Sequence, residues 1–422
     1  MFSKKEFLWT FSERVVTLIG GMAVLKILAV GLSIEEYGYY ALVTSICALV
    51  VMLPFGSLTQ GISRYISIYK TSPSKYNKFV KSSLELLFLI STFYFLLAFL
   101  IKDSLSLGPI WEGIYYLLTF FIFSEMLKLL YKTINNANRR RSNLAISSLL
   151  EFSVKVIFLY VLWGGDGAIS IKSALLILIL SNAVSIVILS NAINVPNVTK
   201  INIRSSKMFI LRIFNFSAPV LIWSVFGWLR DMSNRWYLDY FLDKESVALF
   251  AMISSIAMIA PMALHGLLDS LLKPILYQKH NEDKRNSGEV LYRLLPLVLL
   301  IFLLAFVVVL FYKNEIILIV ADDKYLKLSW MLPWMFLTFS IYSLSMISTY
   351  ELFTCNQTRR LIISSIVPGV VSIVLGYFFI KNYGLSGALY NYIAVYLSYS
   401  ILTFIAVFRY RIHQVKGEYA NK

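Results

Sequence analysis

The sequence predicts an all-α polytopic membrane protein with about twelve transmembrane helices. Of its 422 residues, 58% are hydrophobic and 15% are charged, whereas soluble domains carry roughly 25% charged residues. The apolar residues fall into blocks of about 18–25, which suits a helix that crosses a bilayer and is too long for a barrel strand. The short connections between these blocks leave no room for a soluble domain.

We expect two sets of six spans. The first apolar block is too long for a cleavable signal peptide and is not followed by a small-residue cleavage site, so it counts as a span. Pro54, Pro219, Pro261 and Pro368 lie inside or near spans, where a proline bends the helix and frees a carbonyl. The expected spans are residues 15–33, 38–60, 84–101, 113–132, 144–163, 172–193, 215–238, 246–268, 292–312, 329–350, 361–380 and 386–408.

Basic residues are concentrated in alternate connections, whereas the other connections carry acidic pairs such as Glu35-Glu36 and Asp322-Asp323. Lysine and arginine are retained on the cytoplasmic side of a membrane. We therefore expect both termini in the cytoplasm, which requires an even number of spans. The basic connections hold Lys4, Lys5, Arg14, Arg64, Lys70, Lys75, Lys78, Lys81, Lys132, Arg139, Arg140, Arg141, Lys200, Lys207, Arg212, the segment from Lys273 to Arg293, Arg359, Arg360 and the tail from Arg409.

The longest basic connection, about 194–214, is polar and divides the chain almost in half. We interpret it as a linker between an N-terminal lobe, residues 1–200, and a C-terminal lobe, residues 201–422. Each lobe would hold six helices, and the two pseudo-symmetric lobes would surround a central cavity.

An internal repeat supports this division. Glu35–Gly56 aligns without gaps to Glu245–Gly266, with six identities in 22 positions. Each match shifts the span number by six, so the halves are parallel repeats about an axis along the membrane normal. A second match relates Ala145–Ser148 and Gly164–Ala168 to Ile362–Ser365 and Gly384–Ala388.

Four features of the sequence resemble one family. They are Ser33–Ala41 after the first span, Asn234–Phe250 at the end of the seventh, Tyr383–Ala388 before the last, and Pro219. They resemble polysaccharide exporters of the O-antigen flippase (Wzx) type, in the multidrug/oligosaccharidyl-lipid/polysaccharide exporter superfamily. The sequence departs from this family at Asn234, where an aspartate is common, so this position offers no carboxylate for ion coupling.

The resemblance implies alternating access and a substrate of undecaprenyl diphosphate that carries an oligosaccharide repeat unit, as in O-antigen and lipopolysaccharide synthesis. It also implies a place in the bacterial inner membrane, contact with membrane lipid, and a glycan polymerase and other assembly proteins as partners. Such a substrate needs cations for its diphosphate and polar or aromatic side chains for its sugars.

Charged residues inside spans are candidates for these roles, because burial of a charge in hydrocarbon is costly. Lys26 lies mid-span with no acidic residue within one helical turn, and the repeat aligns it with Trp236, next to Arg235. We predict that Lys26 and Arg235 line the cavity at similar depth. The alternative for Lys26 is a side chain that extends to the interface or pairs with a distant acid.

The seventh span supplies three more cavity candidates, Arg230, Asp231 and Trp223. We expect Asp231 to neutralise one arginine, and Arg235 is favoured because it lies four residues further along the helix. Trp223 lies deep enough to stack on a sugar. The aromatic residues nearer the span end are better explained as part of the interfacial belt.

Two further groups complete the candidates. Glu125/Lys128 and Glu151/Lys155 have the spacing of pairs on one helix, so a purely structural role competes with a place in the cavity. The candidates for a gate or cytoplasmic opening are Arg14, His265, Asp269 and Lys273. For these, a topology anchor (Arg14) or an interfacial polar stripe (the others) is the alternative.

No catalytic or metal-binding signature occurs, since P-loop, HExxH, CxxC and GxSxG patterns are all missing from the sequence. Cys47 and Cys355 lie near different spans and imply neither a disulfide nor a metal site. The net charge of +16 is scattered over many loops, unlike the single basic face of a nucleic-acid-binding protein. We predict no cofactor, no nucleic-acid partner and no enzymatic activity.

Two other functional classes compete with a flippase for a lipid-linked oligosaccharide. A cation-coupled drug exporter of the same superfamily would place a carboxylate deep in the first span, where this chain has Lys26. A membrane glycan polymerase would need a large outward loop with catalytic residues, and the longest outward connection, about 313–328, is short. The flippase is therefore favoured.

Overall fold

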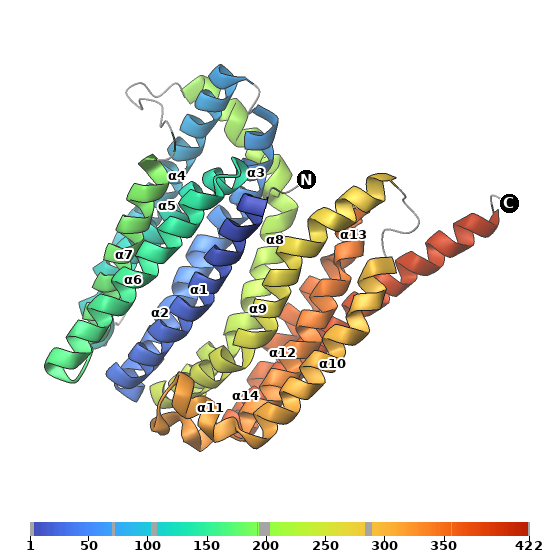
Figure 1. The fold of residues 1–422 in the computed structure, drawn as a ribbon. Coiled ribbons are helices and arrows are strands. Elements are labelled where there is room, and N and C mark those ends of the chain that lie inside the picture. Colours follow the sequence, from blue (N-terminus) through green and yellow to red (C-terminus); the bar gives the residue numbers. More distant parts are fainter. Residues whose placement is uncertain are drawn as a thin grey trace. The chain divides into compact units, whose positions relative to one another are not determined.

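The computed structural model describes residues 4–69, 72–102, 108–191, 193, 203–282, 289–355 and 357–420, and their regular structure is entirely helical (Figure 1). Within these residues, 10 helices are long and apolar enough to cross a membrane, and the bent helix α8 is an eleventh. The last of the ten, α14, breaks at Gly384 and so supplies two spans. The prediction of about twelve spans is confirmed.

The chain divides into two compact units, Met1–Val225 and Phe226–Lys422. This division lies within α8, whereas the sequence suggests a boundary near residue 200. The helices up to this point are α1 (Lys4–Gly31), α2 (Ile34–Val50), the π-helix η1 (Val51–Gly56), α3 (Ser57–Tyr69), α4 (Pro73–Lys102), α5 (Pro109–Ala137), α6 (Arg141–Asp166), α7 (Ile171–Asn191) and α8 (Ile203–Phe241).

The second unit continues with a helix of 39 residues, α9 (Lys244–Glu282). It packs against α12, which in turn packs against α10 and α14. The elements are α10 (Glu289–Phe311), α11 (Lys313–Val320), the 3-10 helix η2 (Asp323–Leu328), α12 (Met331–Ser348), α13 (Tyr350–Thr354), the 3-10 helix η3 (Thr358–Leu361) and α14 (Ile362–Ala420).

In the first unit, α1 packs along α6, and α7 packs against both α5 and α6. Gly20 and Gly31 permit the close approach of α1. A Cβ atom at these positions would lie 2.6 Å from Phe152 and 2.5 Å from Ile169, respectively. The amide of Ile169 also donates a hydrogen bond of 2.8 Å to the carbonyl of Gly31, which fixes the end of α1 to the α6–α7 connection.

The helix of the second span continues further than predicted. After the π-helix that contains Pro54, it runs on as α3 to Tyr69, so Arg64 lies on a helix, whereas the sequence places it in a loop. The helix continues because Leu58, Ile62 and Ile66 recur every four residues and are each fully buried.

Helix α8 is also longer than predicted, because it begins at Ile203, within the expected linker. It bends by 57° between Lys207–Asn215 and Val220–Phe241, at the position of Pro219, which has no amide hydrogen to donate. Its first half packs on α3, where Arg212 donates a hydrogen bond of 2.7 Å to the hydroxyl of Tyr69. The first part of the predicted linker, residues 194–202, lies outside the described residues.

The internal repeat is visible where the second helix of each half begins. The Ser33 hydroxyl accepts a hydrogen bond of 3.2 Å from the amide of Glu36, and the Asp243 carboxylate accepts one of 2.7 Å from the amide of Ser246. Such a side chain satisfies an amide that has no carbonyl partner in the first turn. The repeat aligns Ser33 with Asp243, so it preserves a cap as well as a hydrophobic pattern.

Backbone angles change the alignment of the second match of the repeat. Gly167, which ends α6, has φ 68°, and Gly384, which breaks α14, has φ 55°. Gly167 follows Ala145 by the same interval that separates Gly384 from Ile362. The structure therefore pairs Gly384 with Gly167, whereas the sequence match paired it with Gly164.

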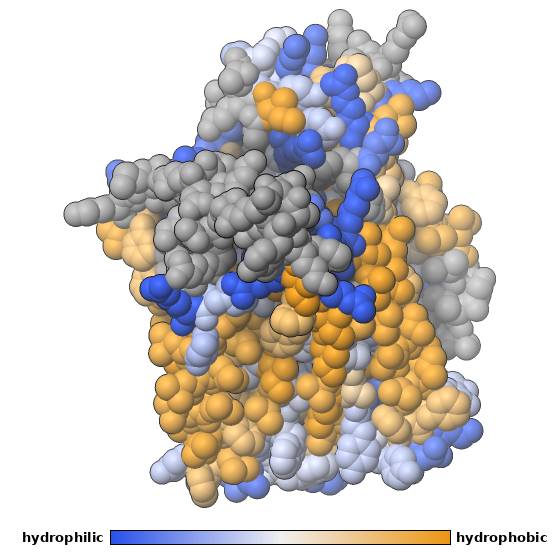
Figure 2. All heavy atoms as spheres, turned by 90° about the vertical axis from the view of Figure 1, so that its right-hand side faces the viewer, coloured by the Kyte–Doolittle hydropathy of each residue, from blue (hydrophilic) through white to orange (hydrophobic). Residues whose placement is uncertain are grey.

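Apolar side chains cover the outer surfaces of many helices. On the face drawn in Figure 2, hydrophobic residues form a broad area and hydrophilic residues gather toward its ends. On α10, Leu300, Leu304 and Phe311 are 53%, 61% and 73% exposed. Exposed apolar surface of this extent is expected where helices face lipid.

Candidate functional site

The second unit contains an ion pair between two adjacent residues of α8, of which only the arginine side chain is largely covered. The guanidinium of Arg230 donates two hydrogen bonds to the carboxylate of Asp231, from Nε at 2.7 Å and from Nη2 at 3.0 Å. The side chain of Arg230 is 10% exposed and that of Asp231 is 35% exposed. Asp231 thus neutralises one of the two arginines as expected, but its partner is Arg230 and not the favoured Arg235.

Three tyrosine rings surround this arginine. The Cζ atom of Arg230 lies 5.1 Å from the ring centres of Tyr342 and Tyr399 and 5.7 Å from that of Tyr396. The hydroxyl of Tyr396 donates a hydrogen bond of 2.8 Å to Asp231. Cation–π attraction and a paired carboxylate together stabilise a charge that burial alone would destabilise.

These rings belong to a larger aromatic cluster between α12 and α14. Tyr392 and Tyr396 have ring centres 4.6 Å apart, and Phe339 lies 5.1 Å and 5.0 Å from them. A cation, a carboxylate and tyrosine hydroxyls in one cluster can bind anionic and hydroxyl-rich groups. Because Arg230 is covered, Asp231 is the more accessible member of the pair.

A pair of asparagines lies beside this cluster. Asn391 of α14 donates a hydrogen bond of 2.6 Å to the side-chain oxygen of Asn234, and Asn234 donates one of 3.3 Å to the carbonyl of Ala388. Both asparagines are buried. Asn234, which stands where the resembling family commonly has an aspartate, therefore joins α8 to α14 through neutral hydrogen bonds.

The first unit contains a separate charged network, built from α5, α6 and α7. Lys128 donates hydrogen bonds to Glu125 at 2.8 Å, Glu151 at 3.0 Å and the side-chain oxygen of Asn182 at 2.7 Å. Lys155 donates to the same Glu151 oxygen at 2.5 Å. Both predicted pairs form, and Lys128 joins them into one network with two positive and two negative charges.

The three remaining cavity candidates lie on α1 and α8. Lys26 lies half-buried on α1, and Arg235 lies half-buried on α8. Trp223, also on α8, is 39% exposed. Their place in a cavity between the lobes stays a prediction.

The gate candidates have different environments. Arg14 is exposed on α1. His265 lies half-buried on α9, where its ring centre is 5.9 Å from that of Tyr350, and its carbonyl accepts a hydrogen bond of 3.3 Å from the Tyr350 hydroxyl. Asp269 interacts with the same tyrosine, whereas the side chain of Lys273 lies outside the described residues.

Sequence reasoning missed the polar and aromatic partners from neighbouring helices. Asn182 is a polar residue in an apolar span, which is a usable signal. Tyr392, Tyr396 and Tyr399 recur at helical spacing in the last span. That these tyrosines face Arg230 depends on how α14 is rotated against α8, which the pattern on one helix does not give.

The comparisons with known proteins agree on the fold. The structure resembles an inward-facing multidrug resistance MATE family transporter of the MOP superfamily, with TM-score 0.69, 16% identity and coverage of 95% of this chain and 96% of the other. It resembles the lipid II flippase MurJ, with TM-score 0.70, 19% identity and coverage of 98% and 88%. It also resembles a mutant of the Vibrio cholerae MATE transporter VcmN, with TM-score 0.66, 13% identity and coverage of 96% of both chains.

The protein is thus a multi-span membrane protein with the fold of MOP superfamily transporters. Residues 3–278 match the family model described as Polysaccharide biosynthesis protein, so the chain belongs to that family. No curated protein matches its sequence.

Proposed function

We propose that this protein is a flippase that moves an oligosaccharide linked to undecaprenyl diphosphate across the bacterial inner membrane by alternating access of two lobes. One observation carries the proposal. A chain of the polysaccharide biosynthesis family has a fold that resembles the lipid II flippase MurJ over 98% of its length. We further propose that the repeat unit belongs to O-antigen or a similar polymer, and that a glycan polymerase receives it.

Charge and aromatic surface support this choice of substrate. In our proposal, Lys26 and Arg235 bind the diphosphate, because each is a half-buried cation in a membrane helix, where charged side chains are rare and usually belong to a substrate or ion pathway. Trp223 is exposed enough to stack on a sugar ring. The Arg230–Asp231 pair and its tyrosines would hold the α8–α14 side of the site in place.

The test replaces Lys26 and Arg235 by alanine, singly and together, and measures surface polysaccharide at matched abundance in the membrane. We expect each single variant to lower export about tenfold and the double variant to abolish it, since a charge-assisted contact to phosphate contributes about 1.5–3 kcal/mol. Lys172→Ala, at an exposed position in the first turn of α7, is the control. Full export by the double variant contradicts the proposed site.

A drug exporter is the second candidate, because the MATE multidrug transporter gives a TM-score of 0.69, close to that of MurJ. The two functions differ in what a deletion strain loses. A flippase deletion removes surface polysaccharide and accumulates lipid-linked oligosaccharide, with unchanged resistance to cationic drugs. Loss of drug resistance with normal polysaccharide would reverse our choice.

A further inference from the structure

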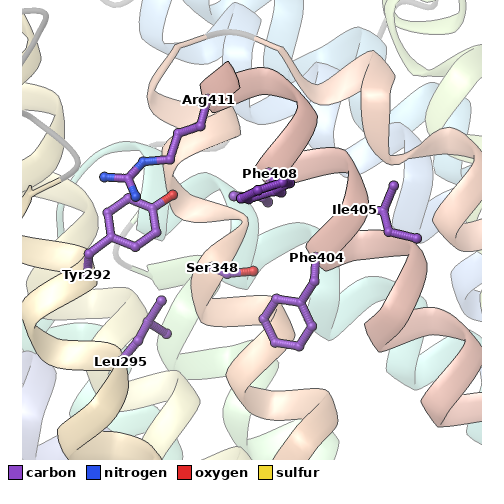
Figure 3. Close-up of a pocket in the computed structure, with 8 residues that line it drawn as sticks. Tyr292, Leu295, Ser348, Phe404, Ile405, Phe408 and Arg411 are labelled. Atoms are coloured by element: carbon purple, nitrogen blue, oxygen red, sulfur yellow. The ribbon is translucent and has the colours of Figure 1, made fainter. Parts of the chain in front are cut away.

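The second unit has a surface pocket of about 360 Å³ between α10, α12 and α14 (Figure 3). This volume lies in the range of about 300–1,000 Å³ that is typical of small-molecule sites. The walls are mainly apolar, and one arginine lies at the edge. The lining residues are Tyr292, Leu295, Ser348, Phe404, Ile405, Val407, Phe408 and Arg411.

Arg411 is held at this edge by an aromatic ring. Its Cζ atom lies 3.3 Å from the ring centre of Tyr292, and Figure 3 shows the guanidinium beside that ring. The Tyr292 hydroxyl donates a hydrogen bond to the buried carboxylate of Glu351, which fixes the ring in turn. A guanidinium stacked by its face keeps its N–H groups directed outward in its plane.

No hydrogen bond or ion pair is found for the Arg411 guanidinium among the residues that the structure describes. Its neighbour Arg409 is exposed, and both arginines lie in the last turns of the final apolar span, which ends at Ile412. The charge pattern predicts that this end of α14 lies at the cytoplasmic surface. The polar edge of the pocket is thus at the depth of lipid headgroups.

The apolar part of the pocket opens toward lipid-exposed surface. Phe408 and Ile405, which form one wall, are 65% and 56% exposed, whereas Val407 and Ser348 are buried. A hydrocarbon chain laid in this pocket would extend from the bilayer without crossing a polar surface. A molecule with an anionic head and an apolar tail matches both parts of the pocket.

We propose that this pocket binds an anionic glycerophospholipid of the surrounding bilayer, with its phosphate on Arg411 and one acyl chain along Leu295, Phe404 and Phe408. Arginine binds phosphate through paired N–H donors, and basic pockets between membrane helices on the cytoplasmic side are suited to anionic headgroups. The site is separate from the residues proposed for the transported substrate.

The test is native mass spectrometry of the full chain in detergent, titrated with palmitoyl-oleoyl phosphatidylglycerol or with the zwitterionic phosphatidylcholine of the same chains. We expect the phosphatidylglycerol adduct to be favoured, and Arg411→Ala to weaken it about fivefold or more. Arg409→Ala, which removes an equal charge two residues away and outside the pocket lining, should change it less than about twofold.

Two further arms separate the headgroup from the pocket. Ile405→Trp places a larger side chain in the apolar part of the pocket, at an exposed position, and keeps the charge of Arg411. It should weaken the binding of phosphatidylglycerol. Inorganic phosphate should not displace the lipid, because it has no chain to bury. Equal loss in the Arg411 and Arg409 variants, equal retention of the two lipids, or displacement by inorganic phosphate would each overturn the proposal.

Discussion

A single carboxylate oxygen of Glu151 forms ion pairs with two buried lysines. Lys128 and Lys155 lie 3.0 Å and 2.5 Å from that oxygen, and all three side chains are at most 14% exposed. Within this network, the only other carboxylate is Glu125, 2.8 Å from Lys128. The charges balance as a group of four, so the loss of one member affects the whole group.

We predict that Glu151→Leu lowers the stability of the protein by about 3–5 kcal/mol, the cost of breaking a buried ion pair by removing one partner. The measurement is the thermal midpoint of the purified protein in detergent. Glu112→Leu, an exposed position on the neighbouring helix α5, is the control and should shift the midpoint little.

The double variant Glu151→Leu with Lys155→Met tests whether charge balance is the cause. It leaves Lys128 with Glu125, a neutral pair that keeps its 2.8 Å contact. The double variant should therefore recover part of the lost stability. If it is less stable than the single variant, the effect of Glu151 comes from packing.

Single residues show which parts of the site the sequence predicts. Glu125/Lys128 and Glu151/Lys155 form as their spacing predicts, because both members of each pair lie on one helix with fixed geometry. For Asp231 the sequence favoured Arg235 over Arg230, because i,i+1 side chains normally diverge, whereas in the structure Asp231 pairs with Arg230, whose guanidinium lies against tyrosines of α12 and α14. Contacts between helices depend on rotation about each helix axis, which composition does not determine.

At the scale of elements, Gly384 decides how α14 forms two spans. Its φ of 55° and ψ of −130° are non-helical, although the residues on both sides are helical. This combination is accessible to glycine and strongly unfavourable for residues with a Cβ atom. The glycine therefore sets the break between the last two spans, and it belongs to the stretch Tyr383–Ala388 that resembles the family.

We predict that Gly384→Ala destabilises the protein by about 1–3 kcal/mol through backbone strain. Steric conflict contributes little, because the nearest atom to an added Cβ is 3.7 Å away in Leu242. The control is Gly227→Ala, at a helical position on α8 where a Cβ meets nothing within 4 Å, which should be neutral or stabilising. Equal midpoints for both variants would show that the break tolerates a side chain.

Helix lengths show a second limit of sequence reasoning. Hydropathy located the apolar blocks, but α3 and the start of α8 are less apolar and were assigned to connections. These segments are helical because they pack on each other: the ring centres of Tyr69 and Phe209 are 5.6 Å apart, and Arg212 donates a hydrogen bond to the Tyr69 hydroxyl. A helix stabilised by such packing has no need of a continuous apolar run.

At the scale of the whole molecule, the orientation in the membrane follows from the predicted number of spans and from the charge of the connections. Lys75, exposed at the start of α4, lies in a basic connection, whereas Lys327, in η2, has a side chain that is 70% exposed and lies in a connection with acidic residues. The span assignment places seven spans between them, an odd number. The two positions must therefore face opposite sides of the membrane.

We predict that a membrane-impermeant maleimide labels Lys327→Cys in intact cells and Lys75→Cys only after lysis, in a background where Cys47 and Cys355 are replaced. The reason is that positive charge is retained in the cytoplasm, and Lys75 belongs to the basic set. Labelling of both sites after lysis is the control for reactivity. Labelling of both in intact cells would contradict the odd number of spans, and labelling of Lys75→Cys alone would invert the orientation. Inversion would also move Arg411 to the outer surface, so this experiment decides on which leaflet the proposed phospholipid must lie.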